Sequence, residues 1–198
     1  MAIQGQVGSL TRNEERARVA GHDPVVLVGA VKSNDGVYPT GLLLTKNAAL
    51  QLVALVVAAA EVIETGDGAT KAFTGSLANV PVEPGTVSIT DGVETFADDG
   101  CGRLTGSAGG SGTINYTTSA YSITFNANVV NAVEVTAGYI TAVDGVLDTQ
   151  VDTSIASSGI RVVHGTVDSS VLKVGKTSSV APSATVLALL QRKGIYPI

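Results

Sequence analysis

The chain has 198 residues, a formal net charge of −5 at pH 7, a single cysteine and no tryptophan. One cysteine excludes an intrachain disulfide and any multi-cysteine metal site, and two histidines leave catalysis little to work with. We therefore predict a protein that is not an enzyme and has no cofactor and no metal site.

The charge is unevenly distributed along the chain. Residues 72–160 carry nine acidic side chains against one basic one, Arg103, whereas residues 161–198 carry five basic side chains and one acidic one. Affinity for a phosphate backbone comes from neutralising it with Lys and Arg, so the acidic middle argues against nucleic-acid binding. The longest apolar run, Ala48–Ala60, is too short for a bilayer, which needs about 20 residues. We expect neither a nucleic-acid nor a membrane partner.

Residues 1–24 are polar and lack a sustained hydrophobic period, and they include no apolar signal-peptide core. Two interpretations remain open. The segment is either a frayed terminus or a flexible arm that becomes ordered only on a partner.

Residues 25–60 alternate between β-rich runs and turns. Val25–Val31 predicts a strand, and the Asp-Gly of residues 33–36 predicts a turn because these residues tolerate positive φ. Val37–Thr45 predicts a second strand, interrupted by a proline and a glycine. The Ala48–Ala60 run has the length of a buried helix and the valine content of a strand, and we favour strand.

Residues 61–141 read as a succession of hairpins. The whole chain contains 23 glycines, and only 4% of its residues are aromatic. This composition favours short strands around an aliphatic core. Alternating polarity without a helix signal implies an antiparallel β-sandwich, which also holds most of the acidic excess. The predicted hairpins are Glu61–Thr65 with Thr70–Thr74, Thr86–Thr90 with Val93–Ala97 around Asp91-Gly92, and Gly112–Thr117 with Tyr121–Asn126, and Val133–Ile140 closes the block.

Residues 142–198 contain a predicted strand, Ile160–Val167, and the best helix of the chain, Ala184–Lys193. Ser183 is placed to cap the first turn of this helix, and Gly194 is placed for a left-handed C-terminal cap. Ile195 can then fold back onto the last turn. The fold class predicted from all these elements is mainly β with a minor α component.

Motifs that suggest chemistry have simpler explanations. Gly175-Lys176-Thr177 lacks the upstream glycine and the following helix of a phosphate-binding loop. The glycines of residues 100–106 lie among hairpins, outside the strand–helix–strand context of a dinucleotide site. We expect His22 and His164 to be structural, and Cys101 to pack as a small apolar group.

The two outer zones of the chain resemble the lambda-type phage head decoration proteins, also called capsid cement proteins. The resembling residues include Gly41-Leu42-Leu43-Leu44, Val163-His164-Gly165-Thr166-Val167, and the tail from Ala181-Pro182-Ser183 to Gly194-Ile195-Tyr196-Pro197. The resemblance covers residues 1–60 and 142–198. It implies a small decoration domain, made of residues 25–60 and 142–198, with one C-terminal helix.

The middle of the chain resembles a β-rich module of various phage virion proteins. The residues concerned are Phe73-Thr74-Gly75-Ser76-Leu77-Ala78-Asn79, Pro81, Pro84-Gly85 and Ile89-Thr90-Asp91-Gly92. The simplest decoration proteins lack this module. It is therefore expected as a lobe, residues 61–141, inserted into the decoration domain.

The resemblance implies a protein of the outer capsid surface, made in the host bacterial cytoplasm and bound to the major capsid protein. It implies a homotrimer at three-fold positions of the expanded head, which stabilises the head against internal DNA pressure. Residues 1–24 would form an arm that adds a strand to a coat-protein sheet. The expected capsid-binding residues are Gln6, Val7, Gly8, Ser9, Leu10, Thr11, Arg12, Asn13, Arg16 and Arg18.

Two other functions remain open. The acidic lobe could bind a host receptor or glycan through its loops, because sandwich lobes often carry recognition there. A hydrolase built around His164 is the other alternative, although nothing in the sequence points to a catalytic triad.

Overall fold

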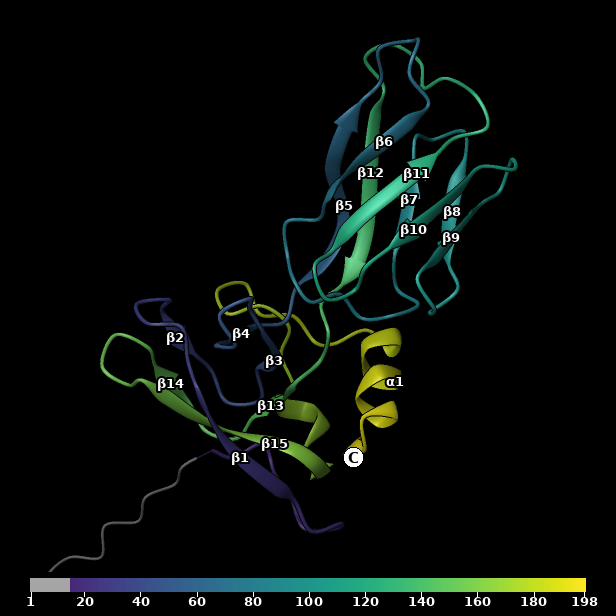
Figure 1. Ribbon diagram of the computed structural model, residues 1–198. Coiled ribbons are helices and arrows are strands. Elements are labelled where there is room, and N and C mark those ends of the chain that lie inside the picture. Colours follow the sequence, from purple (N-terminus) through teal and green to yellow (C-terminus); the bar gives the residue numbers. More distant parts are fainter. Residues whose placement is uncertain (1–14) are drawn as a thin grey trace, which may run out of the picture.

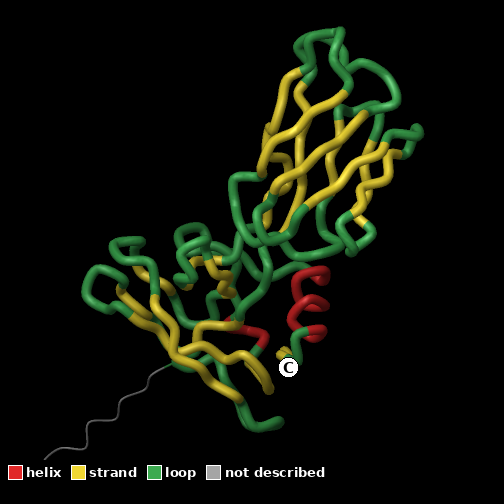
Figure 2. The backbone as a smooth tube through the Cα atoms, in the orientation of Figure 1, coloured by secondary structure: helices red, strands yellow, loops and turns green. Residues whose placement is uncertain are grey.

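The structure is a computed structural model that describes residues 15–198. Figure 1 shows two bodies joined by a short neck: a base, which we define as residues 15–56 and 141–198, and a lobe, residues 57–140. Strands dominate both bodies and the one α-helix of the described residues lies in the base (Figure 2). The predicted fold class, mainly β with a C-terminal helix, is confirmed.

The base is built on a six-stranded sheet in which β15 pairs with β1 on one side and β13 on the other. The order continues from β13 to β3 and then β4. β16 pairs in parallel with the C-terminal end of β15. A separate ribbon pairs β2 with β14. The elements of the base are β1 (Val25–Ala30), β2 (Val37–Tyr38), β3 (Leu43–Lys46), β4 (Leu52–Ala54), β13 (Gly145–Leu147), β14 (Val151–Asp152), β15 (Ser158–Val167), a 3₁₀ turn (Ser169–Val171), α1 (Ala184–Arg192) and β16 (Ile195–Pro197).

Helix α1 forms as its sequence predicts. The Ser183 side chain accepts a hydrogen bond from the Val186 amide, which satisfies one of the free amides of the first turn. Its apolar face packs into the core of the base, and Gly194 follows at φ +79°, where a side chain would be strained. Ile195 is then buried in the same core, so the chain end is docked.

The predicted strand Val37–Thr45 is wrong, because β2 and β3 belong to different sheets. Between them the chain turns sharply at Gly41, whose φ is +76° and whose absent Cβ would lie 2.0 Å from the Val171 carbonyl oxygen. The Ala48–Ala60 run forms strand, as favoured, but it is divided between β4 and β5 (Val57–Thr65). The lobe boundary expected at Glu61 falls inside β5.

The lobe is one continuous eight-stranded antiparallel sheet that folds over on itself into two layers. Figure 1 shows β6, β11 and β10 crossing over β5, β12 and β7. The buried apolar side chains of the lobe form one core cluster. Its strands, in spatial order, are β5 (Val57–Thr65), β12 (Glu134–Ile140), β7 (Ser88–Thr90), β8 (Thr95–Asp98), β9 (Arg103–Gly106), β10 (Ser111–Ile114), β11 (Ala120–Thr124) and β6 (Ala72–Ser76).

Two of the three predicted hairpins form. β10 pairs with β11, and β7 pairs with β8, although the Asp91-Gly92 turn spans residues 91–94 and not two residues. The predicted hairpin around Gly66-Asp67-Gly68 is wrong: β5 pairs with β12, and β6 pairs with β11. The chain crosses there from one end of the sheet to the other, and Ile63 of β5 and Phe73 of β6 pack into the same core.

The neck that joins the bodies is two strands wide. Val57 and Ile140 are partners in the β5–β12 ladder, and the Thr141 amide donates to the Val56 carbonyl at 3.0 Å. Glu83 reinforces the junction from the lobe, because its buried carboxylate accepts from the Val143 amide at 3.3 Å and contacts Lys193 at 3.4 Å. The chain therefore enters and leaves the lobe side by side.

Candidate interaction surfaces

The N-terminal segment is anchored on the base by one buried carboxylate. The Asp148 side chain is fully buried, and it contacts the guanidinium groups of Arg16 and Arg18, each at 3.2 Å. It also accepts from the Arg18 amide at 3.3 Å. A buried charge needs such partners to offset its desolvation, so these contacts fix the backbone around Ala17.

The flexible arm predicted to extend to residue 24 is wrong for its last part. Ala17 is fully buried in the core of the base, and its amide and carbonyl bond to Asp148 and Asp168. Arg18 forms a β-bridge with Val167. The sequence pattern missed this docking because the anchoring residue lies 130 positions away.

Of the ten residues expected to bind the capsid, only two lie in the described part of the chain. The Arg16 and Arg18 side chains, 40% and 35% exposed, both contact the Asp148 carboxylate, so their charges contribute to the anchor. The others fall outside the described residues: Gln6, Val7, Gly8, Ser9, Leu10, Thr11, Arg12 and Asn13.

An apolar edge strand lies beside this anchor. β1 is the end strand of the base sheet and has β15 as its one neighbour among residues 15–198. Val25, Leu27 and Val28 are exposed by 50%, 47% and 70%, respectively. A shallow groove beside β1 is lined by Val28, Ile160 and Ile155. Sequence periodicity predicted the strand but could not show which of its faces lacks cover.

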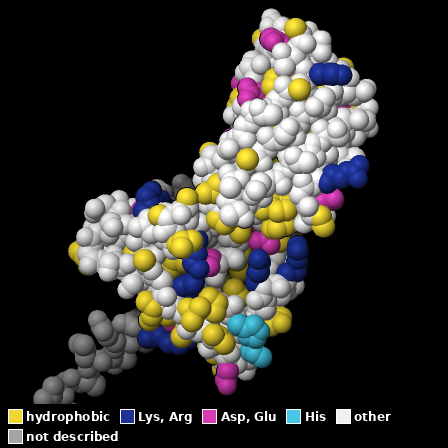
Figure 3. Space-filling model, in the orientation of Figure 1, with side chains coloured by type: hydrophobic (Ala, Val, Ile, Leu, Met, Phe, Trp, Pro, Cys, Tyr) yellow, Lys and Arg dark blue, Asp and Glu magenta, His cyan; other side chains and the backbone are white. Residues whose placement is uncertain are grey.

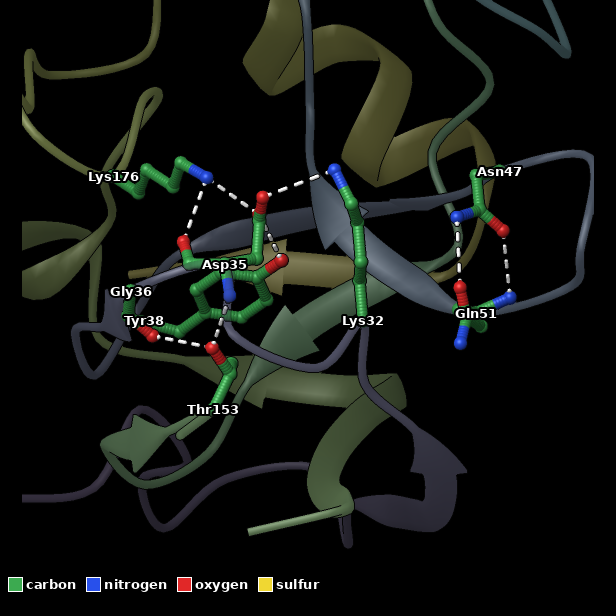
Figure 4. Close-up of polar contacts among 8 residues, drawn as sticks. All are labelled: Lys32, Asp35, Gly36, Tyr38, Asn47, Gln51, Thr153 and Lys176. Atoms are coloured by element: carbon green, nitrogen blue, oxygen red, sulfur yellow. Dashed lines mark hydrogen bonds and ion pairs between the residues drawn. The ribbon is translucent and has the colours of Figure 1, made fainter. Parts of the chain in front are cut away.

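A cluster of polar side chains around Asp35 ties three loops of the base together (Figure 4). The Asp35 carboxylate contacts Lys176 at 2.5 Å and Lys32 at 3.1 Å, and accepts from the Tyr38 hydroxyl at 2.7 Å. The Asp35 amide donates to the Thr153 hydroxyl, also at 2.7 Å. Both lysines have a carboxylate partner, so the arrangement is a structural ion-pair network.

The surroundings of Asp35 shift the pKa of two groups. Burial raises the pKa of the Asp35 carboxyl, but hydrogen bonds from Lys176, Tyr38 and Lys32 outweigh it and bring the pKa to about 2. Burial and the Asp35 carboxylate together raise the pKa of Tyr38 above its usual value. The cluster is therefore charged and fully bonded at neutral pH.

The end of the lobe away from the neck carries a second candidate surface, which we call the lobe tip: residues 66–71, 91–94, 107–110 and 125–133. Glu94 holds two of these loops, because its buried carboxylate accepts from the amides of Gly110 at 2.6 Å and Asn126 at 2.7 Å. Val93 and Val130 are exposed by 82% and 61%. The aromatic rings of the lobe are buried or half-buried, so none offers an open face to a sugar.

Chemistry-bearing residues are sparse in the described structure. Residues 15–198 contain no group of three or more His, Cys, Asp or Glu side chains placed to hold a metal ion. His22 and His164 lie edge to face with ring centroids 4.8 Å apart, on the surface of the base (Figure 3). Cys101 is exposed, so its expected packing as an apolar group is wrong. The helix described here is not long and apolar enough to cross a membrane.

Comparison with protein-family models, with curated proteins and with solved structures finds no match to this chain.

Proposed function

We propose that this protein is a capsid decoration protein, which binds the outer surface of an expanded phage head and stabilises it against internal DNA pressure. It would act as a homotrimer at three-fold positions, with the major capsid protein as partner. The resemblance of the base segments to lambda-type decoration proteins motivates the proposal.

The observation that carries the proposal is the anchored N-terminal segment. Its backbone is fixed at Ala17 by the buried Asp148, so residues 1–14 are joined to a rigid point on the base. A short peptide tethered in this way loses less entropy on binding than a free one. Strand addition to a coat-protein sheet would use main-chain hydrogen bonds, which suits the polar, glycine-containing sequence of residues 4–11.

The arrangement of the two bodies also supports the proposal. The anchored segment and the lobe tip lie at opposite ends of the molecule in Figure 1. A protein held on a shell through its N-terminal segment would therefore present its lobe away from the shell. The lobe carries nine acidic and two basic side chains, which keeps this outward part soluble and self-repelling.

Removal of residues 2–14 tests the proposed mechanism. The deletion stops before Arg16 and Ala17, so the anchor and the core of the base are retained and the chain should fold normally. Binding to expanded shells assembled from the accompanying coat protein, measured by co-sedimentation, should fall more than about tenfold if main-chain pairing supplies the affinity.

The matched control replaces residues 2–14 by a Gly-Ser sequence of the same length, which retains the tether but removes the side chains. Binding that survives in the deletion would contradict the arm mechanism. Absence of the protein from purified mature virions would contradict the function itself.

Recognition of a host surface by the lobe tip is the second candidate function. The exposed Val93 and Val130 on tip loops favour it, because isolated apolar side chains on such loops often contribute to contacts. Adsorption of virions that carry Val93→Asp in the full chain should then be slower than that of unmodified virions. Equal adsorption would leave the tip without support as a receptor-binding surface.

A further inference from the structure

The outer edge of β1 lacks the charged side chains and the internal proline that commonly protect a sheet edge. The strand reads Val-Val-Leu-Val-Gly-Ala, with no charged or polar side chain and no proline. Natural edge strands avoid self-association through charged side chains, proline or bulges. In β1 the ladder is irregular only between Val25 and Val26, which leaves the rest of the edge regular.

The apolar surface continues from the edge into the groove beside it. Val28 and Ile160 are ladder partners on the same face, and Ile155, which lines the same groove, is 87% exposed. Asp152 is the one charged side chain of the groove, and its carboxylate is bonded to the Ser154 amide and hydroxyl. Val28, Ile160 and Ile155 together form a surface almost free of charge along the open edge of β1, which we call the β1 patch. Leu27 points to the opposite face of the sheet, and Val25 and Leu27 lie outside this patch.

The end strands of the lobe sheet differ from β1, because they carry charged or polar side chains. The end strand β5 carries Glu61 and Glu64, and the opposite end strand β6 carries Thr74 and Ser76. The contrast within one molecule indicates that the β1 patch is covered by a partner during the life of the protein.

We propose that the β1 patch is the contact between copies of this chain. Charge favours an identical copy as the occupant. The patch has almost no charge that a contact would leave unpaired. The base carries nine basic and seven acidic side chains, so two bases would repel each other little. The acidic lobes, which would repel one another, extend away from the base (Figure 1). An identical chain is also present from the moment the strand folds, whereas a shell is met later.

This inference deepens the proposed function, since it gives the proposed trimer a contact surface, and it rests on that function for the number of copies. Its physical basis is the unprotected edge alone. Each copy would bury an apolar strand and groove of the kind that forms the core of stable homo-oligomer interfaces.

The experiment measures the mass of the full chain by sedimentation velocity and light scattering. The unmodified protein should form a closed oligomer of at least twice the 19.9 kDa chain mass, and three times if the trimer is correct. Ile155→Lys should reduce the mass to that of one chain. Ile155 is 87% exposed, so the substitution places a charge in the patch without disturbing the core.

Val28→Lys is a second variant, on the strand itself. Val93→Lys on the lobe tip is the matched control, because it adds the same charge at a valine whose exposure is similar to that of Val28 and Ile155. Circular dichroism checks that all three are folded. A monomeric unmodified chain at about 100 μM, or an Ile155→Lys oligomer of unchanged mass, would overturn the inference.

The outcome is separable from that of the proposed function. An unmodified chain that is monomeric yet binds shells contradicts the β1 contact and leaves the capsid function standing. An oligomer that dissociates on Ile155→Lys substitution but never binds shells supports the contact and contradicts the capsid function.

Discussion

The base and the lobe hold their acidic side chains in different ways. In the base, buried or half-buried carboxylates are neutralised by basic side chains: Asp35 by two lysines, Asp144 by Lys46 and Arg161, and Asp148 by two arginines. In the lobe, carboxylates accept from backbone amides of turns, as Glu94 does. Asp67 and Asp99 also accept from turn amides. A hydrogen bond from the Thr70 hydroxyl, followed by those from the Ala69 and Thr70 amides, lowers the pKa of Asp67, and hydrogen bonds from the Cys101 and Arg103 amides lower the pKa of Asp99.

The difference shows how each body is organised. Ion pairs in the base join segments distant in sequence, such as residues 16–18 with residue 148, so they fix the tertiary arrangement. Amide-bound carboxylates in the lobe shape individual turns and leave tertiary cohesion to the apolar core. The base should therefore respond to pH and salt through its charges, whereas the lobe should respond mainly to changes in packing.

The largest effect is expected from Phe96→Ala in the lobe. Phe96 is fully buried, with its ring edge to face with Phe125 at 5.0 Å, and truncation of a core phenylalanine costs about 3–5 kcal/mol. Hydrogen exchange should accelerate throughout residues 57–140 and remain slow in β15. Val93→Ala, at an exposed lobe position, is the control. Equal acceleration in the base would show that the two cores unfold together and would break the comparison.

Asp148→Ala should have the next largest effect and should act on the base. It removes the acceptor of the Arg18 amide and of two guanidinium groups, which we expect to cost about 1.5–3 kcal/mol, the range for hydrogen bonds to a charged group. Denaturant unfolding measures the loss, and the amides of Ala17 and Val19 should exchange faster. Asp23→Ala, an exposed acid nearby, should change neither quantity. Unaltered exchange at Ala17 would contradict the anchor.

Asp35→Asn tests the charge dependence of the base. The folded pKa of Asp35 is lowered to about 2 from 3.8, so its stabilisation is fully present above pH 4 and is lost as the pH falls towards 2. Unmodified protein should be more stable than the variant by about 1–3 kcal/mol at pH 7, and the gap should close between pH 4 and 2. A gap that stays constant over this range would argue against the ion pairs as its source.

Ser183→Ala should have the smallest effect, about 1 kcal/mol, because one capping hydrogen bond to the Val186 amide is lost. The loss should appear in the unfolding of the base and not in that of the lobe. Thr185 is an exposed residue in the first turn of the same helix, and Thr185→Ala should leave stability unchanged or raise it slightly. Equal losses from both substitutions would mean that the cap contributes nothing specific.

Elements with local signals were predictable from the sequence. Ser183 and Gly194 mark the two ends of α1, and the alternation of Tyr121 and Ile123 marks a strand with one buried face. In each case the deciding interactions lie within a few residues. The secondary structure of these segments therefore follows from their own composition.

Partner choice and anchoring were not predictable in this way. The turn Gly66-Asp67-Gly68 has the local chemistry of a hairpin, yet β5 selects β12 because of packing across the lobe. β16 could not be recognised as a parallel partner of β15, and Asp148 could not be recognised as an anchor, because their contacts join distant segments. The exposure of the β1 patch likewise depends on what the rest of the fold leaves uncovered.

The paired neck has a practical consequence. Because Val57 and Ile140 face each other in an antiparallel ladder, their Cα atoms are about 5 Å apart, the spacing of such partners. Any foreign domain whose first and last residues lie equally close could be grafted at this point with little strain on the remaining β-sheet. If copies of the chain coat a particle, the same position would become a site for multivalent display of cargo chosen by the experimenter.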